Sequence, residues 1–313
     1  HCRHGKPPET IAAARLRLVI EKKNEMKPAL EKAPRPDEDA RRQSWIEYLD
    51  RSHALFTAML KYPVAECGER FASIPDAAQA AGVEMHFSET KIAGQFERIF
   101  FIREGLIEDL MAIGRDMNSR GWILKIEEGF RTKEMQTALG RNPAVFDRII
   151  AMLQWENHGA PPPLELVNKR LTCLVANYPV SGTHMSGAAV DISVFRRDDR
   201  AEVWRGAPYL TMSEITPMDS PFVSAAEQQN RRAITQIMER HGFLHYPGEF
   251  WHYNKGDALY QFMTKSGKPG RYGPVHWDAR TNSVTPYDDY FAPLTPPELL
   301  RQSVAEALER LKQ

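Results

Sequence analysis

The amino-acid sequence predicts an α+β fold with helical extensions at both ends of the chain. The N-terminal part carries mainly helical patterns, a mixture of helices and strands begins at about Phe71, and the tail from about Thr295 is helical again. The chain contains no internal repeat and no low-complexity tract. These observations favour one mixed domain with added helices over a repeat architecture.

Two helices are expected in the N-terminal part. The segment EKAPRPDED (31–39) is rich in proline and charge and is expected to separate them. Over residues 37–62, apolar and aromatic residues recur at a spacing typical of an amphipathic helix. These positions are Ile46, Leu49, His53, Phe56 and Leu60.

The middle of the chain predicts helices around a strand. Residues 104–119 carry an apolar stripe at helical spacing, and so do residues 143–157. Between them, WILKIEEG (122–129) alternates apolar and polar residues and predicts a strand. One face of that strand is expected to carry Trp122, Leu124 and Ile126.

The last third of the chain predicts two further helices. Ser224 and Glu227 form a capping box at the start of one helix, and Gly242 is a stop signal after its last turn. The aromatic segment FLHYPGEFWHY (243–253) then favours β structure except at its Pro-Gly. A helix from about Thr295 ends the chain, with an apolar stripe.

Composition excludes several function classes. Of the 313 residues, 26% are charged and 42% are hydrophobic, which is typical of soluble globular domains. Lys plus Arg and Asp plus Glu both number 41, so no basic excess attracts nucleic acid or an anionic membrane. No apolar run approaches the roughly 18 residues of a membrane span. The three scattered cysteines, Cys2, Cys67 and Cys173, argue against a disulfide framework and a cysteine zinc site.

The segment VSGTHMSGAAVDISV (180–194) combines a histidine and an aspartate with small and apolar residues. Gly187 and the two alanines after it allow close backbone approach, and AVDISV is strand-like. An aspartate inside an apolar strand must be paired or bound to a metal, because burying an isolated carboxylate is costly. His184 and Asp191 are therefore candidate metal ligands, although a lone histidine is more often a surface or core residue.

Candidate partners occur in PGEFWHY (247–253). Glu249 and His252 are three positions apart in an otherwise aromatic and apolar stretch. On a regular strand they would point to opposite faces, so both can approach one metal only if the backbone bends near Pro247 and Gly248. The alternative is two independent residues at a strand end.

Together these residues make a plausible hydrolytic zinc site. Two histidines and an aspartate fill three of the four positions of zinc and leave the fourth for water. A carboxylate that is not a ligand must then accept the proton of that water, and Glu249 fits this role. A cation beside the developing oxyanion is also needed, and Arg131, at the end of the 122–129 strand, is the best candidate by pattern.

The two segments resemble the motif pair of the zinc D-Ala-D-Ala metallopeptidases. This family includes vancomycin-resistance dipeptidases and carboxypeptidases, and it shares its fold with lysostaphin-type enzymes and the hedgehog signalling domain. Seven positions match in order: His184, Gly187, Ala189 and Asp191, followed by Glu249, Trp251 and His252.

The resemblance implies a small antiparallel sheet that carries the zinc site and is flanked by helices. It implies that His184, Asp191 and His252 bind one Zn²⁺ per chain, that Glu249 is the general base, and that Arg131 faces the scissile carbonyl oxygen. We expect a helical N-terminal extension over residues 1–70, a catalytic domain over 71–276, and a C-terminal tail and helix over 277–313.

At the positions expected to bind substrate, the chain departs from the family pattern. The family usually has a serine where this chain has Gly182, with Ser181 and Thr183 on either side as candidate substrate-binding residues. Asp219 is the candidate counterpart of an acidic residue that meets the substrate amine. Trp251 is expected to form a wall beside the metal.

The expected function is zinc-dependent hydrolysis of a short peptide containing D-amino acids, most simply D-Ala-D-Ala. The alternatives are a D,D-carboxypeptidase or endopeptidase acting on peptidoglycan stem peptides, and a hedgehog-like zinc-binding module, which would need neither Glu249 nor Arg131. The chain begins at His1 rather than methionine, so a removed signal peptide or a trimmed start is expected. We expect a bacterial protein of the cell envelope, with the cytoplasm as the alternative and the oligomeric state open.

Overall fold

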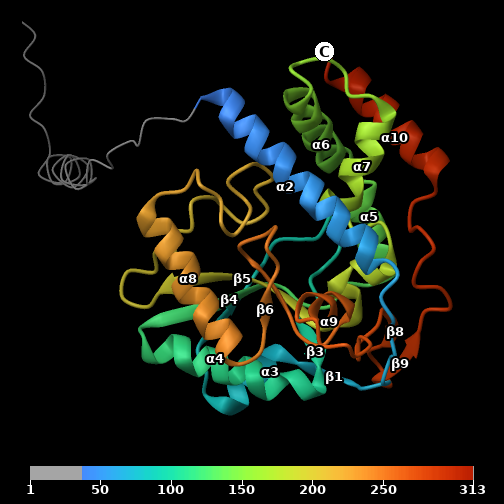
Figure 1. Cartoon of the computed structure of the whole chain (residues 1–313). Helices are drawn as coiled ribbons and strands as arrows, with labels where there is room; N and C mark the ends of the chain where they lie inside the picture. Colours follow the sequence, from blue (N-terminus) through green and yellow to red (C-terminus); the bar gives the residue numbers. More distant parts are fainter. Residues whose placement is uncertain (1–36, 313) are drawn as a thin grey trace, which may run out of the picture. The chain divides into compact units, whose positions relative to one another are not determined.

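The computed structural model describes residues 37–312 and confirms the α+β fold class. Its centre is a five-stranded sheet with the strand order β2-β4-β5-β7-β6, of which Figure 1 labels β4, β5 and β6. The strands are β2 (Met85–Phe87), β4 (Trp122–Glu128), β5 (Ala189–Arg196), β7 (His252–Asn254) and β6 (Leu244–His245). The β4–β5, β5–β7 and β7–β6 pairs are antiparallel, as expected, whereas the β2–β4 pair is parallel.

Helices pack against this sheet through the main hydrophobic core. They are α3 (Ile74–Ala81), α4 (Ile107–Ser119), which follows the short 3-10 helix η1 (Glu104–Leu106), and α8 (Ala225–Arg240). α4 packs on β4, and α8 packs on β6 and α4 (Figure 1). Val190, Ile192 and Val194 of β5 are fully buried in this core. β5 is thus a rigid central strand, and Asp191 lies within it.

A second group of helices builds its own core. It comprises α5 (Lys133–Gly140), α6 (Pro143–Glu156), α7 (Leu164–Leu174) and α10 (Pro297–Arg310). α6, α7 and α10 share a hydrophobic cluster, and α2 (Glu38–Met59) runs along α7 (Figure 1). The side chains that α2 buries are Arg42, Trp45, Leu49, Ser52, Phe56 and Met59.

Short elements complete the fold around the metal-ligand segments. β1 (Phe71–Ser73) pairs with β3 (Phe101–Arg103), and β8 (Val275–Asp278) pairs with β9 (Ser283–Pro286). The 3-10 helices η2 (Pro179–Ser181) and η3 (Thr183–Ser186) precede β5, and α9 (Ala258–Met263) follows β7.

Most of the predicted elements are confirmed. The helices expected over 104–119, 143–157 and from Ser224 are present, and the capping box of Ser224 and Glu227 forms in both directions. Trp122, Leu124 and Ile126 of β4 all contribute to the main core, as expected for one face of the strand, and Ile123 on the other face is buried as well. β4 lies between β2 and β5 and is covered on both faces.

Two other predictions concern the ends of the chain. The break expected over 31–39 lies mostly outside the described residues, as does the expected helix before it. The C-terminal helix is present as α10, with Val304 buried and Leu311 at 40% exposure. Within residues 37–312, no helix is both long and apolar enough to cross a membrane.

Candidate active site

The register of the central sheet aligns three polar residues across adjacent strands. Glu128 of β4 is opposite Asp191 of β5, and Asp191 is opposite His252 of β7. Residues directly opposite each other on neighbouring strands project from the same face. A register shift between Ile126 and Glu128 brings the end of β4 into this row, as β-bulges near sites commonly do.

His184 reaches the same place from the short helix η3. Gly187 ends η3 with a φ of +70°, a conformation that favours glycine. A Cβ atom at this position would also lie 2.2 Å from Cε1 of Phe71. Gly187 therefore allows both the tight turn and the close contact with Phe71 that set His184 beside β5.

A buried arginine fixes this turn to the rest of the domain. Arg103 is 0% exposed, and its Nε donates to the carbonyl oxygen of Ser186 at 2.6 Å. Its two terminal nitrogens donate to the Glu66 carboxylate at 2.9 and 3.0 Å, and also to the carbonyl oxygens of Glu69 and Gly273. Arg103 thus joins three separate loops directly behind the histidine turn.

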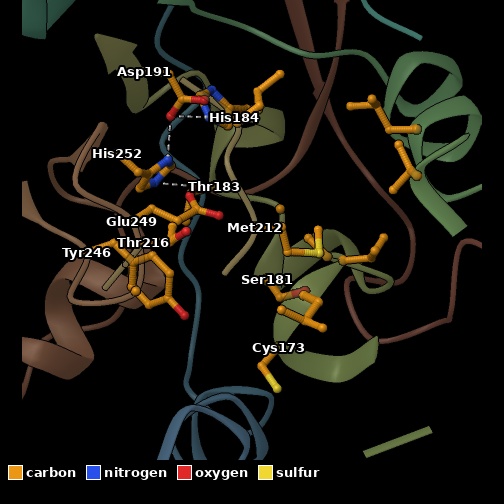
Figure 2. A pocket seen from close by; sticks show the side chains of 18 of the residues that line it. Cys173, Ser181, Thr183, His184, Asp191, Met212, Thr216, Tyr246, Glu249 and His252 are labelled. Atoms are coloured by element: carbon orange, nitrogen blue, oxygen red, sulfur yellow. Dashed lines mark hydrogen bonds and ion pairs between the residues drawn. The ribbon is translucent and has the colours of Figure 1, made fainter. Parts of the chain in front are cut away.

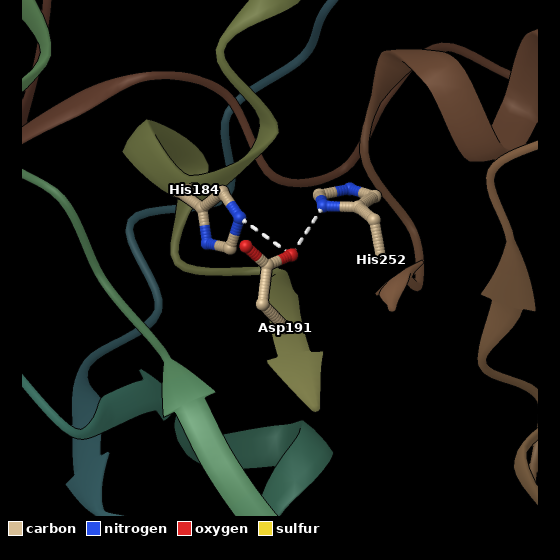
Figure 3. A group of neighbouring side chains, drawn as sticks. All are labelled: His184, Asp191 and His252. Atoms are coloured by element: carbon tan, nitrogen blue, oxygen red, sulfur yellow. Dashed lines mark hydrogen bonds and ion pairs between the residues drawn. The ribbon is translucent and has the colours of Figure 1, made fainter. Parts of the chain in front are cut away.

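His184, Asp191 and His252 form a buried group that could hold a metal ion (Figure 3). One potential ligand atom from each residue lies within 4.8 Å of the others. Oδ1 of Asp191 is 3.2 Å from Nε2 of His184 and 2.9 Å from Nδ1 of His252. Two imidazoles and one carboxylate are the donor set of many catalytic zinc sites with an open fourth position.

The hydrogen bonds of the two imidazole rings are consistent with metal binding. Nδ1 of His184 lies 2.8 Å from the carbonyl oxygen of Gly129, which can only accept, so Nδ1 donates. In a neutral ring the lone pair of Nε2 then faces an oxygen of Asp191. Two such acceptors repel each other unless a proton or a cation lies between them, and a metal ion meets this need. On the other ring, Nε2 of His252 is 2.9 Å from the hydroxyl oxygen of Thr183.

Asp191 is held in its charged form. Burial alone would raise its pKa, but His184 and His252 hold the pKa of Asp191 well below its usual range. The phenol of Tyr209 donates to Oδ2 of Asp191 at 2.9 Å, the oxygen that does not contact the imidazoles. Burial raises the pKa of Tyr209 well above its usual value, so this phenol remains a donor.

Glu249 lies in two consecutive turns between β6 and β7. The amide of Glu249 donates to the carbonyl oxygen of Tyr246, and the amide of His252 donates to that of Glu249. This bend at Pro247 and Gly248 explains how residues three apart reach one pocket, as the sequence required.

Helix α2 packs directly on the turn that carries Glu249. A Cβ atom on Gly248 would lie 2.0 Å from the phenol oxygen of Tyr48, so glycine is needed there. The phenol oxygens of Tyr48 and Tyr246 are 3.4 Å apart. The pKa of the Glu249 carboxyl is raised to about 7, mainly by burial; His252 lowers it and the Asp191 carboxylate raises it.

Arg131 is oriented by a buried carboxylate. Its Nε and Nη2 donate to the two oxygens of Glu128 at 2.8 and 2.7 Å, and its Nη1 donates to Gln136 at 2.6 Å. Within the described residues, three of its five N–H groups thus have partners, and two are available to a substrate oxygen. Burial lowers the pKa of Arg131, but Glu128 more than offsets this, and the net pKa is raised.

A cavity of about 430 Å³ brings the predicted site residues together (Figure 2). Its lining includes eight of the nine predicted residues: Arg131, Ser181, Thr183, His184, Asp191, Glu249, Trp251 and His252. The ninth, Asp219, is not brought to the site. It is exposed and accepts a hydrogen bond from Gln228, because the chain reaches α8 outside the cavity.

The structure also shows the contacts of the predicted substrate-binding residues that line the cavity. Thr183 contacts His252, and the hydroxyl of Ser181 donates to the carbonyl oxygen of Tyr178. Trp251 is 3% exposed and packs edge-on against Tyr209, as expected for a wall. The helix α2, which we assigned to an N-terminal extension, lines the same cavity through Trp45, Tyr48 and Phe56.

Sequence reasoning missed several residues of the site. Glu128 had a usable signal, since two consecutive acidic residues end an apolar strand just before the Gly-Phe-Arg turn. Tyr209 had none, because an irregular loop separates it from Asp191. Tyr48 had none either, because its contact with the Glu249 turn joins segments about two hundred positions apart.

A buried pair of imidazoles with one carboxylate, next to a free carboxylate and an oriented arginine, is typical of metal-dependent hydrolases. The family model described as D-Ala-D-Ala dipeptidase, of the M15 peptidases, matches residues 154–266. The D-alanyl-D-alanine dipeptidase of Enterococcus faecium is 26% identical over 182 residues, which cover 56% of this chain and 78% of that protein. The dipeptidase of Enterococcus faecalis is 31% identical over 29% of this chain and 46% of that protein.

Two solved structures are also similar. The LdcB LD-carboxypeptidase is 17% identical, with a TM-score of 0.34 and coverage of 66% of this chain and 79% of that chain. The vancomycin-resistance D,D-pentapeptidase VanY, solved with Zn(II), is 14% identical, with a TM-score of 0.30 and coverage of 65% and 93%.

The similarity to zinc D-Ala-D-Ala metallopeptidases that the two sequence segments indicated is confirmed over residues 154–266. The chain is a zinc metallopeptidase, and the described structure contains a side-chain group suited to the zinc ion. Arg131 and α2 lie outside the segment that the family model matches.

Proposed function

We propose that this enzyme hydrolyses the peptide bond of a short D-amino-acid-containing peptide, most simply free D-Ala-D-Ala. The observation that carries the proposal is the convergence of His184, Asp191, His252, Glu249 and Arg131 on one cavity. A non-catalytic zinc-binding module would need only the first three of these residues. The similarity to bacterial dipeptidases supports this substrate and a role in bacterial cell-wall metabolism.

In the proposed mechanism, His184, Asp191 and His252 hold the zinc ion. When bound, zinc acts as a Lewis acid toward the scissile carbonyl group and lowers the pKa of water. The Gly129 carbonyl oxygen and the Thr183 hydroxyl orient the two imidazoles, and Tyr209 orients the carboxylate. These contacts keep the three side chains in position before the metal and substrate arrive.

Glu249 is the proposed general base and then general acid. Its carboxylate lines the cavity but is not among the three potential ligands, so it is available for proton transfer. It would accept a proton from the attacking water and pass it to the leaving amine. The contacts of Tyr48 and Tyr246 hold the turn on which this transfer depends.

Arg131 is proposed to stabilise negative charge on the scissile carbonyl oxygen. Its bidentate contact with Glu128 fixes the plane of the guanidinium, and its two remaining N–H groups can meet that oxygen. The arrangement is oriented in advance, so little rearrangement is needed during the reaction.

The test is product analysis with zinc-loaded enzyme on free D-Ala-D-Ala and on a pentapeptide ending in D-Ala-D-Ala. The proposal expects release of D-alanine from the free dipeptide. Release of D-alanine from the pentapeptide alone would replace the dipeptidase assignment with that of a carboxypeptidase.

A further inference from the structure

The cavity extends well beyond the metal group. In Figure 2, His184, Asp191 and His252 lie at one end and Cys173 at the other, with Met212 between them. Cavities of about 300–1,000 Å³ enclose drug-sized ligands, whereas D-Ala-D-Ala has only about 11 non-hydrogen atoms. At about 430 Å³, this cavity has room for more than an alanyl dipeptide.

The part of the cavity away from the metal carries six apolar side chains, beside polar ones of the same segments such as Asn142, Thr172 and Thr211. We call it the apolar chamber and define it by Leu139, Val145, Leu174, Val175, Leu210 and Met212. They come from α5, α6, the end of α7 and the loop before α8. The first four and Met212 are only half-buried, so they retain apolar surface that a ligand could cover. Covering such surface favours binding in proportion to the area removed from water.

The chamber offers no good partner to a charged group. Among the described residues that line the cavity, the charged ones other than Arg148 belong to the metal end. Arg148 is exposed, and its guanidinium donates to the carbonyl oxygen of Leu210. A lysine side chain placed in the chamber would lose hydration without gaining an anionic partner among the described lining residues.

Leu210 adds exposed apolar surface at the edge of the chamber. It is 50% exposed and has a φ of +65°, a backbone region that is unfavourable for leucine. An exposed leucine held in this way at the edge of a cavity has surface to offer an apolar ligand.

We propose that the apolar chamber is a substrate subsite for a bulky, uncharged, apolar side chain next to the cleaved bond. The inference rests on the proposed function, because it assumes that the metal end cleaves a short peptide. It extends the substrate class from D-Ala-D-Ala to dipeptides with one leucine-sized apolar residue and disfavours lysine at that position.

The experiment compares kcat/KM of the zinc enzyme on five dipeptides of D-amino acids: Ala-Ala, Leu-Ala, Ala-Leu, Lys-Ala and Ala-Lys. We expect the better leucyl peptide to exceed D-Ala-D-Ala by at least about tenfold, since even one methylene group in an apolar pocket gives about 10–200-fold discrimination. The lysyl peptide that carries lysine at the same position as that leucine should have a kcat/KM about tenfold lower than that of D-Ala-D-Ala. Leucyl peptides cleaved no faster than D-Ala-D-Ala, or no faster than lysyl peptides, would overturn the subsite.

A substitution links the preference to the chamber. Met212→Glu places a carboxylate among the apolar residues and should shift the leucyl-to-lysyl ratio toward lysine by at least about tenfold. Leu164→Glu is the matched control, because Leu164 is 42% exposed and is not among the residues that line the cavity. A ratio that moves equally in both variants, or in neither, would contradict the proposal.

A binding measurement separates this inference from the proposed function. If no peptide is cleaved by enzyme with bound zinc, the proposed function fails. Calorimetry of the same peptides with zinc-loaded Glu249→Ala then tests the chamber alone. Tighter binding of the leucyl than of the lysyl peptide supports the subsite, and equal or reversed affinities reject it.

Discussion

Replacing Tyr209 by phenylalanine tests whether Asp191 is a zinc ligand that the Tyr209 phenol orients through a hydrogen bond. The change removes one oxygen atom, which lies 2.9 Å from Oδ2 of Asp191, and keeps the ring that packs on Trp251. Asp191 is 3% exposed, so water cannot easily replace the lost donor. A hydrogen bond to a charged group contributes about 1.5–3 kcal/mol. At about 1.4 kcal/mol per factor of ten, zinc affinity should fall by about 10–150-fold.

The assay is competition for zinc between the protein and a chromophoric chelator. Tyr272→Phe is the matched control, since its phenol also donates to a carboxylate, that of Glu69, at 3.1 Å but away from the metal group. The control should keep wild-type zinc affinity even if it is less stable. Equal zinc affinities for Tyr209→Phe and the wild type would refute the orienting role of Tyr209.

Three further predictions address other parts of the site. Arg103→Met removes the charged partner of the Glu66 side chain, 3% exposed, which keeps only the amides of Gly68 and Gly273; it should cost about 3–5 kcal/mol of unfolding free energy, seen as a lower melting temperature. The double variant with Glu66→Gln should recover part of the lost unfolding free energy. If the effects of the two single substitutions simply add, the two side chains are not a coupled buried pair. Arg131→Lys keeps the charge but loses the planar fork; kcat should fall about 10²–10³-fold with zinc content unchanged, and a wild-type kcat would remove Arg131 from the mechanism. Chelation should abolish hydrolysis, and zinc at about 100 times its Kd should restore it and stabilise the fold by about 2.7 kcal/mol in thermal melts; turnover by fully metal-free enzyme would exclude a zinc mechanism.

Local patterns were sufficient to predict which side chains lie together at the candidate site. His184 and Asp191 lie seven positions apart around a glycine turn, and Glu249 and His252 lie three apart around a Pro-Gly bend. In both segments the residues that bend the backbone lie within a few positions of the side chains that form the site. The structure brings the four residues to one cavity, as the combination of the two segments predicted.

Contacts between distant segments were beyond the sequence patterns. Tyr209 reaches Asp191 from a loop without periodicity, and Arg103 supports the His184 turn from β3 through backbone carbonyl groups that any residue supplies. Helix α2 was correctly expected as a helix, but periodicity cannot tell which surface a helix covers. Its contact with Gly248 therefore emerged only from the packing. Asp219 is the opposite case. It was assigned to the site by position across an irregular loop, and the structure places it elsewhere.

The most direct test of the central claim is the zinc content and turnover of Glu249→Ala beside His252→Ala. If Glu249 is a base rather than a ligand, the first variant keeps one zinc ion per chain and loses D-Ala-D-Ala hydrolysis. The second loses both, because a ligand is removed. Loss of zinc from Glu249→Ala, or retention of its turnover, would contradict the account.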